Sequence, residues 1–177
     1  MTFNVLVLCT GNSARSILGE MLFNHLGQGR IKAYSAGSKP GGVVNPVALE
    51  TLAKHGIPCE GARSKSWDEF GSDAVPPAPS QGIPLRITFH FIFTVCDNAA
   101  NETCPLWPGQ PMTAHWGVPD PAAVEGLEAV KRAAFADTYR MMMNRISIFT
   151  NLPLASIDRL SLQKRLREIG ERRELPA

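Results

Sequence analysis

The first 27 residues constrain the fold most, because a strand-like run meets a helical pattern there across a short polar loop. Residues 3–8 are mostly apolar, which predicts a buried strand. The next segment, 14–27, is predicted to be a helix because hydrophobic residues recur at helical spacing: Ile17, Leu18, Met21, Leu22 and Leu26. A strand that leads directly into a helix is the first half of a βαβ unit, so we expect a parallel sheet.

The loop between these elements carries a nucleophile and a cation, Cys9 and Arg15. The first turn of a helix has unpaired amides and a positive dipole end, so this loop is suited to an anion. Arg15 can hold two oxygens of a tetrahedral anion, and Asn12 tolerates a left-handed backbone. The same positive field predicts a lowered pKa for Cys9 and a thiolate near neutral pH. The alternative is that Cys9 is a buried structural cysteine with no role in catalysis. The expected oxyanion-binding residues are Thr10, Gly11, Asn12, Ser13, Ala14, Arg15 and Ser16.

The rest of the chain continues the alternation of strands and helices. Strands are expected at 31–36, 87–95 and 112–116, and helices at 45–56 and 122–149. This order predicts an α/β fold, namely a small, doubly wound, mainly parallel four-stranded sheet with helices on both faces.

The helix expected at 122–149 should bury one apolar face, formed by Val124, Leu127, Val130, Ala134, Met142, Ile146 and Phe149. The run Met141–Met143 is interpreted as core filler rather than a metal site. A C-terminal helical extension is expected at 156–172, with Ile157, Leu160, Leu166 and Ile169 at helical spacing. Its many charges indicate a solvated face, with a docking surface as the alternative. Residues 71–84 are rich in Pro, Ser and Gly, which predicts a flexible surface loop.

Composition places the chain among ordinary globular proteins and indicates a single domain over 1–177. It is 44% hydrophobic and 19% charged, with a net charge of +2, which gives no argument for binding nucleic acid or a membrane surface. No apolar run approaches the ~20 residues that span a bilayer, and the chain starts directly with its first strand, so we expect a cytoplasmic protein. In that compartment, its four cysteines are expected to be catalytic or redox-active rather than paired in structural disulfides.

Two of these cysteines, Cys96 and Cys104, stand at the two ends of a polar, Asn-rich segment after the third expected strand. Their spacing does not match the short spacings of zinc sites. A mobile segment would let each sulfur reach a partner and pass a disulfide along a relay. The alternative is a pair of incidental thiols. Cys59 follows a helix and is interpreted as structural.

Asp120 precedes Pro121, between a short strand and a long helix. A carboxylic acid placed there can protonate a leaving oxygen, and the proline stiffens its turn. Taken alone, this dipeptide is a common turn signal. Cys9, Cys96 and Asp120 all fall at or beyond the carboxyl ends of expected strands, where ligands bind in sheets of this kind.

The segment Cys9-Thr-Gly-Asn-Ser-Ala-Arg-Ser16 resembles the phosphate-binding loop of the low-molecular-weight protein tyrosine phosphatases and of the arsenate reductases that share their fold. Ser35-Ala36-Gly37 and Asp120-Pro121 resemble further parts of that pattern, and the similarity covers most of 3–150. Asp120 matches the general acid of the family. The phosphatases usually have an aromatic residue after the Asp-Pro pair, and Ala122 stands here, which argues against an aromatic substrate.

The resemblance implies an arsenate reductase without a metal or organic cofactor. Cys9 attacks arsenate held by the loop and Arg15, and Asp120 protonates the departing oxygen. Cys96 then attacks the adduct at Cys9, arsenite leaves, and Cys104 moves the disulfide to the outer pair. Thioredoxin-coupled members carry such a cysteine pair, so thioredoxin is the favoured electron donor, with glutathione and glutaredoxin as the alternative. Phosphate and sulfate are expected competitors. A phosphatase acting on phosphate monoesters and a non-catalytic oxyanion-binding protein remain open as other functions.

Overall fold

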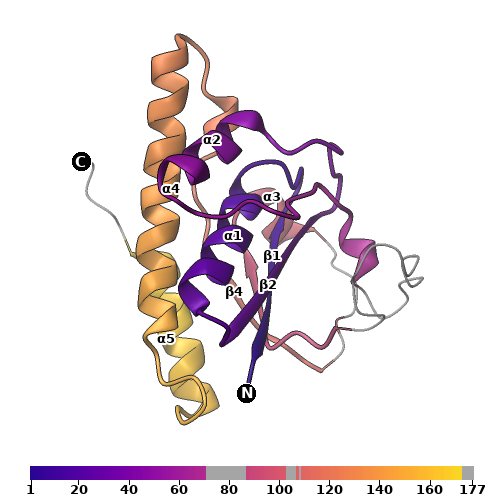
Figure 1. Ribbon diagram of the computed structural model, residues 1–177. Helices are drawn as coiled ribbons and strands as arrows, with labels where there is room; N and C mark the ends of the chain where they lie inside the picture. The colour runs from indigo at the N-terminus through magenta and orange to yellow at the C-terminus, as the bar shows by residue number, and fades with distance from the viewer. Residues whose placement is uncertain (71–86, 103–106, 108, 173–177) are drawn as a thin grey trace.

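The protein is described by a computed structural model that covers residues 1–70, 87–102, 107 and 109–172 (Figure 1). Four strands form one sheet in the order β2-β1-β3-β4, and every neighbouring pair is parallel. The α/β architecture expected from the sequence is therefore confirmed. The strands are β1 (Phe3–Cys9), β2 (Ile31–Gly37), β3 (Phe91–Thr94) and β4 (Met112–His115). The helices are α1 (Arg15–Gly27), α2 (Pro46–Lys54), α3 (Asp97–Asn101), α4 (Glu128–Thr150) and α5 (Arg159–Glu171), with 3-10 turns η1 (Trp67–Glu69) and η3 (Pro121–Ala123).

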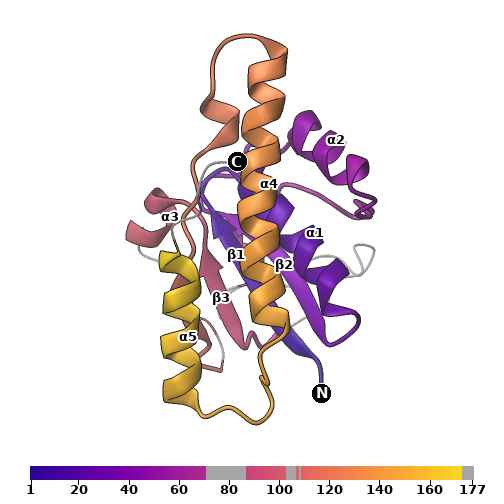
Figure 2. The same ribbon diagram turned by 90° about the vertical axis from the view of Figure 1, so that its left-hand side faces the viewer.

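The sheet separates two hydrophobic clusters, because alternate residues of a strand point to opposite faces. Val5 and Val7 of β1 face the larger cluster, which α1, α4 and α5 cover. Leu6 and Leu8 face a smaller cluster that includes Trp67 of η1. Figures 1 and 2 show α4 running along the sheet, with α5 beside its lower half. Among the described residues, α1, α2, α4 and α5 all pack into the larger cluster, whereas η1 and loop residues cover the smaller one, so the expected placement of helices on both faces is not met.

Strand β3 is shorter than the predicted 87–95, which was wrong at its start. The Asn4 side chain donates to the Thr88 carbonyl at 3.0 Å, and the Asn4 amide donates to Nδ1 of His90 at 2.9 Å. The His90 amide still donates to the Asn4 carbonyl at 2.9 Å, so backbone pairing reaches His90, and a side-chain bond takes its place at Thr88. Ile87 and Phe89 lie outside the strand but are buried in the smaller cluster. Their apolar side chains are therefore explained by burial and not by pairing in the sheet.

Helix α4 begins at Glu128, not near 122 as predicted. Gly126 has a φ of 120°, which a right-handed helix cannot include, so the chain first forms η3 and then restarts. Leu127 and Val130 were expected in the core, but they are 76% and 49% exposed. Met142 is fully buried, which confirms its interpretation as core filler.

Helix α5 confirms the expected C-terminal extension but presents a different face to the core. Leu166 and Ile169 are buried as predicted, whereas Leu160 is 84% exposed and Leu162 takes its place. The indole of Trp116 donates to the Leu166 carbonyl at 2.9 Å, which fixes α5 against the end of β4. The flexible loop predicted at 71–84 lies outside the described residues. Within the described part of the chain, no helix is long and apolar enough to cross a membrane.

Candidate active site

The loop after β1 turns its carbonyl groups outward. Three of them accept hydrogen bonds over 2.8–3.1 Å from the segment between β2 and α2: Lys39 N to Thr10 O, Gly41 N to Gly11 O and Asn45 N to Ser13 O. Each of these carbonyls shares a planar peptide group with the N–H of the next residue, which points the opposite way. The amides of Gly11, Asn12 and Ala14 therefore point into the loop. This arrangement provides a ring of donors at the start of α1 for an oxyanion.

Asn12 organises the loop from the inside. It is fully buried and adopts the left-handed conformation expected from the sequence, with a φ of 45°. Its Nδ2 donates to the hydroxyls of Ser16 and Ser35, at 2.8 and 3.0 Å, and its Oδ1 accepts the Lys65 amide at 2.8 Å. One side chain thus ties the loop to the first turn of α1, to β2 and to the segment before η1.

Glycine at position 37 lets β2 lie directly against the loop. A Cβ atom there would come within 2.3 Å of the Thr10 carbonyl oxygen, which is backbone and has little room to move. The Gly37 amide donates to the Lys65 carbonyl at 2.9 Å, so the same close approach also joins β2 to the segment before η1. The Ser35-Ala36-Gly37 segment therefore supports the loop from behind.

A buried ion pair lies beneath the loop. Nζ of Lys65 is 3.6 Å from a carboxylate oxygen of Glu20, and both side chains are more than nine-tenths buried. The Ser35 hydroxyl donates to the same carboxylate, and Lys65 also donates to Ser35 Oγ at 3.4 Å. Burial raises the pKa of Glu20 and lowers that of Lys65, and the attraction between the two charges offsets each shift only in part.

Arg15 and Asp120 meet at the mouth of the loop, as the sequence predicted for two residues of one site. Nη2 of Arg15 lies 3.6 Å from Oδ2 of Asp120, and Nη1 donates to the Val118 carbonyl at 3.2 Å. The other carboxylate oxygen of Asp120 accepts the Ala122 amide at 3.0 Å, so the acid caps η3 rather than the long helix. Asp120 is 40% exposed and Arg15 is 15% exposed, so both are accessible from solvent.

Cys9 and Cys96 are buried side by side, with 5% and 3% exposure, and their thiols share a hydrogen bond. That bond lowers the pKa of Cys96 to about 5. The bond and burial together raise the pKa of Cys9, although Arg15 acts in the opposite direction. The sequence-based prediction of a lowered pKa for Cys9 was therefore wrong for this arrangement, because it did not include the neighbouring sulfur. Near neutral pH the pair holds one proton and one negative charge.

The surroundings of Cys96 connect the pair to helix α3. Cys96 caps this helix, and its sulfur accepts the Ala99 amide at 3.4 Å. The Thr10 hydroxyl lies 3.5 Å from the Cys96 sulfur and donates to Oε1 of Glu102 at 3.3 Å. At the first residue of α3, next to Cys96, the Asp97 side chain is 89% exposed and bonds Nε2 of His115 at 3.0 Å. Cys104, the expected third member of the relay, lies outside the described residues.

Cys9, Cys59 and Cys96 are free thiols. Cys59 packs against the larger hydrophobic cluster, and its thiol donates to the Ile57 carbonyl at 3.4 Å. In the described ranges, no three His, Cys, Asp or Glu side chains are grouped as metal ligands would be. The described residues around Cys9 thus provide amides, a guanidinium, a carboxyl group and a second thiol.

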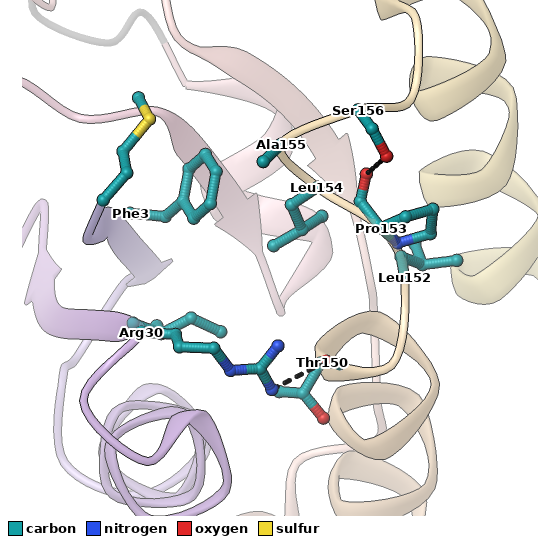
Figure 3. A pocket seen from close by; sticks show the side chains of 10 residues that line it. Phe3, Arg30, Thr150, Leu152, Pro153, Leu154, Ala155 and Ser156 are labelled. Atoms are coloured by element: carbon teal, nitrogen blue, oxygen red, sulfur yellow. Dashed lines mark hydrogen bonds between the residues drawn. The ribbon is translucent and has the colours of Figure 1, made fainter.

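A separate cavity of about 260 Å³ lies near the amino ends of β1 and β2, far along the sheet from Cys9 (Figure 3). Phe3 and Leu154 give it an apolar lining, and Arg30 points across it to donate to the Thr150 carbonyl at 3.0 Å. Its lining does not include Cys9, Arg15 or Asp120, so it is not part of the site at the loop.

The comparisons with known proteins agree with this geometry. Residues 4–75 match the family model described as low molecular weight phosphotyrosine protein phosphatase. An arsenate reductase of Bacillus licheniformis is 34% identical over 143 residues, which cover 80% of this chain and 91% of that protein. The chain belongs to the arsenate reductase family.

Solved structures of the family share the fold. The arsenate reductase of Archaeoglobus fulgidus superposes with a TM-score of 0.58 and 25% identity, covering 84% of this chain and 99% of that one. A thioredoxin-dependent arsenate reductase of Corynebacterium glutamicum superposes with a TM-score of 0.53 and 21% identity, covering 84% of this chain and 63% of its own. The second likeness supports the fold alone.

Sequence reasoning found Cys9, Arg15, Cys96 and Asp120, which the fold brings together, but it missed the support beneath them. Glu20 gave a usable signal, because it is a charged residue on the same helical face as buried Ser16. Its partner Lys65, and the contact of Glu102 with Thr10, gave no local signal.

Proposed function

We propose that the chain reduces arsenate to arsenite through a cysteine nucleophile and a thiol–disulfide relay. The observation that carries this proposal is the contact between the Cys9 and Cys96 thiols beside Arg15 and Asp120. Hydrolysis of a phosphoryl-cysteine needs only water, whereas reduction of arsenic needs a second sulfur within bonding reach of the first. The named relatives, which are arsenate reductases, support the same reaction.

In the proposed mechanism, Cys9 attacks arsenate held by the loop amides and the Arg15 guanidinium, as Asp120 gives a proton to the departing oxygen, which leaves as water. Cys96 then attacks the Cys9 sulfur. A sulfur–sulfur bond forms, the sulfur–arsenic bond breaks, and its electron pair reduces arsenic, so arsenite leaves. Cys104 next attacks Cys96 and moves the disulfide to Cys96 and Cys104. Phosphate and sulfate, which share the tetrahedral shape, are expected to compete with arsenate.

An external dithiol must reduce the last disulfide, and we propose thioredoxin for this role. The proposed relay leaves its disulfide between two cysteines of the chain, Cys96 and Cys104, and a dithiol protein can reduce such a bond by exchange, which supports thioredoxin over glutathione and glutaredoxin. A relay of this kind requires a compartment that keeps thiols reduced, so the cytoplasm is the proposed location.

A single-turnover experiment tests the relay. Arsenate added to fully reduced protein without a reductant should yield one arsenite per chain and a Cys96–Cys104 disulfide, read by peptide mapping. Cys104→Ser should still release that arsenite but stop with Cys9 joined to Cys96, and Cys96→Ser should release none. Cys59→Ser is the matched control and should behave as the unaltered protein.

The second candidate function is hydrolysis of phosphate monoesters, which the phosphatase family model over residues 4–75 favours. Brisk hydrolysis of an aryl phosphate, with all four thiols free after exposure to arsenate, would replace the reductase proposal with this one. Binding of both oxyanions with no turnover of either would indicate a non-catalytic binding protein.

A further inference from the structure

Arg145 of α4 is a buried cation that reaches the segment leading to Asp120. Only 3% of this arginine is exposed. Its Nη1 atom donates to two successive carbonyls just after β4, those of Trp116 and Gly117, each at 3.0 Å. An Nη nitrogen of arginine carries two N–H groups, so one nitrogen can serve both carbonyls. Such charge-assisted bonds are stronger than neutral ones, and burial strengthens them further. Arg145 therefore fixes the path of the chain where it leaves the sheet.

Further hydrogen bonds hold the same segment from its other sides. The Trp116 amide donates to the Thr94 carbonyl at 2.7 Å. The Val118 amide donates to the Val95 carbonyl at 3.1 Å, and the Val118 carbonyl accepts from Nη1 of Arg15 at 3.2 Å. The segment is thus bonded to the end of the sheet through its amides and to two guanidinium groups through its carbonyls.

The position of the Asp120 carboxylate depends on this segment. Pro119 and Pro121 stand on either side of Asp120, and each proline restricts its own backbone and that of the residue before it. A stiff connection of this kind carries the placement of Val118 on to the acid. The carboxylate lies 3.6 Å from Nη2 of Arg15, at the mouth of the anion loop. A displacement of the segment would therefore move the acid relative to a bound oxyanion.

We propose that Arg145 positions Asp120 for proton transfer to the departing oxygen, by holding the carbonyls of Trp116 and Gly117. This inference rests on the proposed reductase function. In the step, the Cys9 sulfur bonds to arsenic while Asp120 gives its proton to the oxygen that leaves as water. Arg145 transfers no proton and keeps its charge throughout. It acts through Asp120 and is a positioning residue.

Formation of the Cys9–arsenate adduct tests the proposal. In a Cys96→Ser background the proposed chemistry stops at this adduct, so rapid-quench kinetics with detection of the intact protein mass measure the first step alone. Adding Arg145→Met should lower the rate at saturating arsenate by about 10–100-fold, because a misplacement of about 1 Å costs up to roughly 10² in rate. Sulfate affinity, measured by calorimetry, should stay unchanged, since the loop amides and Arg15 remain.

Combination with Asp120→Asn separates a positioning role from a merely structural one. If Arg145 acts through the acid, Arg145→Met should cause no further loss of rate once Asp120→Asn has removed that acid. Losses that multiply in the combined variant would overturn the proposal, because they would give Arg145 an effect independent of Asp120.

Two other variants make the result specific. Arg132→Met is the matched control, because Arg132 belongs to the same helix but is 45% exposed and pairs with Glu50, so the rate should stay unchanged. Arg145→Lys keeps the buried charge without the planar fork and serves if urea unfolding shows that the methionine variant does not fold. It should slow the first step less than Arg145→Met does, and its effect should also vanish with Asp120→Asn.

The outcomes for the proposal and for the reductase function are distinct. A folded Arg145→Met protein that forms the adduct at an unchanged rate would overturn the role of Arg145 and leave the reductase function standing. Failure of the unaltered protein to release arsenite would instead overturn the proposed function.

Discussion

Replacing Asn12 by alanine should destabilise the protein by a predictable amount. The change removes the acceptor of the buried Lys65 amide, and an orphaned buried donor costs about 1–3 kcal/mol. It also places a Cβ-bearing residue without local hydrogen bonding at a φ of 45°, where an ordinary residue loses about 1–2 kcal/mol. The Ser16 and Ser35 hydroxyls lose a donor but can rotate toward other partners, so we assign them no large term. The expected loss is about 2–5 kcal/mol.

Urea unfolding of reduced protein measures this loss, provided that the slope of free energy against urea stays constant. Asn12→Gly is the matched control, because it removes the same hydrogen bonds but accepts the left-handed backbone. It should therefore be about 1 kcal/mol more stable than Asn12→Ala. Sulfate affinity, measured by calorimetry, should fall in both variants since the loop loses its internal support. A loss below about 0.5 kcal/mol in Asn12→Ala, the size of an ordinary surface change, would refute the reasoning.

Three further predictions concern the chemistry and its support. Asp120→Asn should slow the first chemical step by roughly 10²–10⁴-fold with little change in oxyanion affinity, as measured by rapid-quench kinetics; an unchanged rate would assign the acid elsewhere. Lys65→Met should destabilise the fold by about 3–5 kcal/mol in urea unfolding because Glu20 loses its buried partner, and adding Glu20→Gln should recover most of that loss; no recovery would mean that the charge is not the cause. Ultraviolet titration should find one thiolate forming near pH 5, from Cys96, and Cys9→Ala should move this transition toward about 8.5 because it removes the hydrogen bond that lowers the pKa most; an unmoved transition would contradict the pairing of the two sulfurs.

The parts of the fold that the sequence predicted well are those set by local patterns. Within the first 27 residues the hydrophobic pattern changes from that of a strand to that of a helix, with a nucleophile and a cation between them. The structure has β1 and α1 at these positions, with Cys9 at the end of β1 and Arg15 at the start of α1. The start of α4 was missed because the apolar spacing continued across Gly126, whose backbone conformation decided the boundary instead. Strand β3 was overextended for a related reason, since Phe89 is apolar because it is buried and not because it pairs.

The parts of the site that were missed depend on contacts between distant segments. Lys65 lies far from Glu20 in the chain, and nothing in its own neighbourhood indicates a buried ammonium group. The direction of the Cys9 pKa shift was mispredicted for the same reason. The helix terminus and Arg15 were visible in the sequence, but the hydrogen bond from Cys9 to Cys96 depends on where β3 ends relative to β1.

Helix α5 has a consequence for how copies of this protein behave toward one another. Strand β4 ends the sheet, so one of its sides has backbone groups that could pair with a strand of another molecule. The Gln163 amide donates to the Thr113 carbonyl on that side at 2.9 Å, and Arg159 donates to the Gln110 carbonyl just before the strand at 3.3 Å. These side chains occupy acceptors that an incoming strand would use. The C-terminal helix therefore acts as a barrier to edge-to-edge aggregation, and a chain cut before Arg159 would expose a template for intermolecular β-pairing.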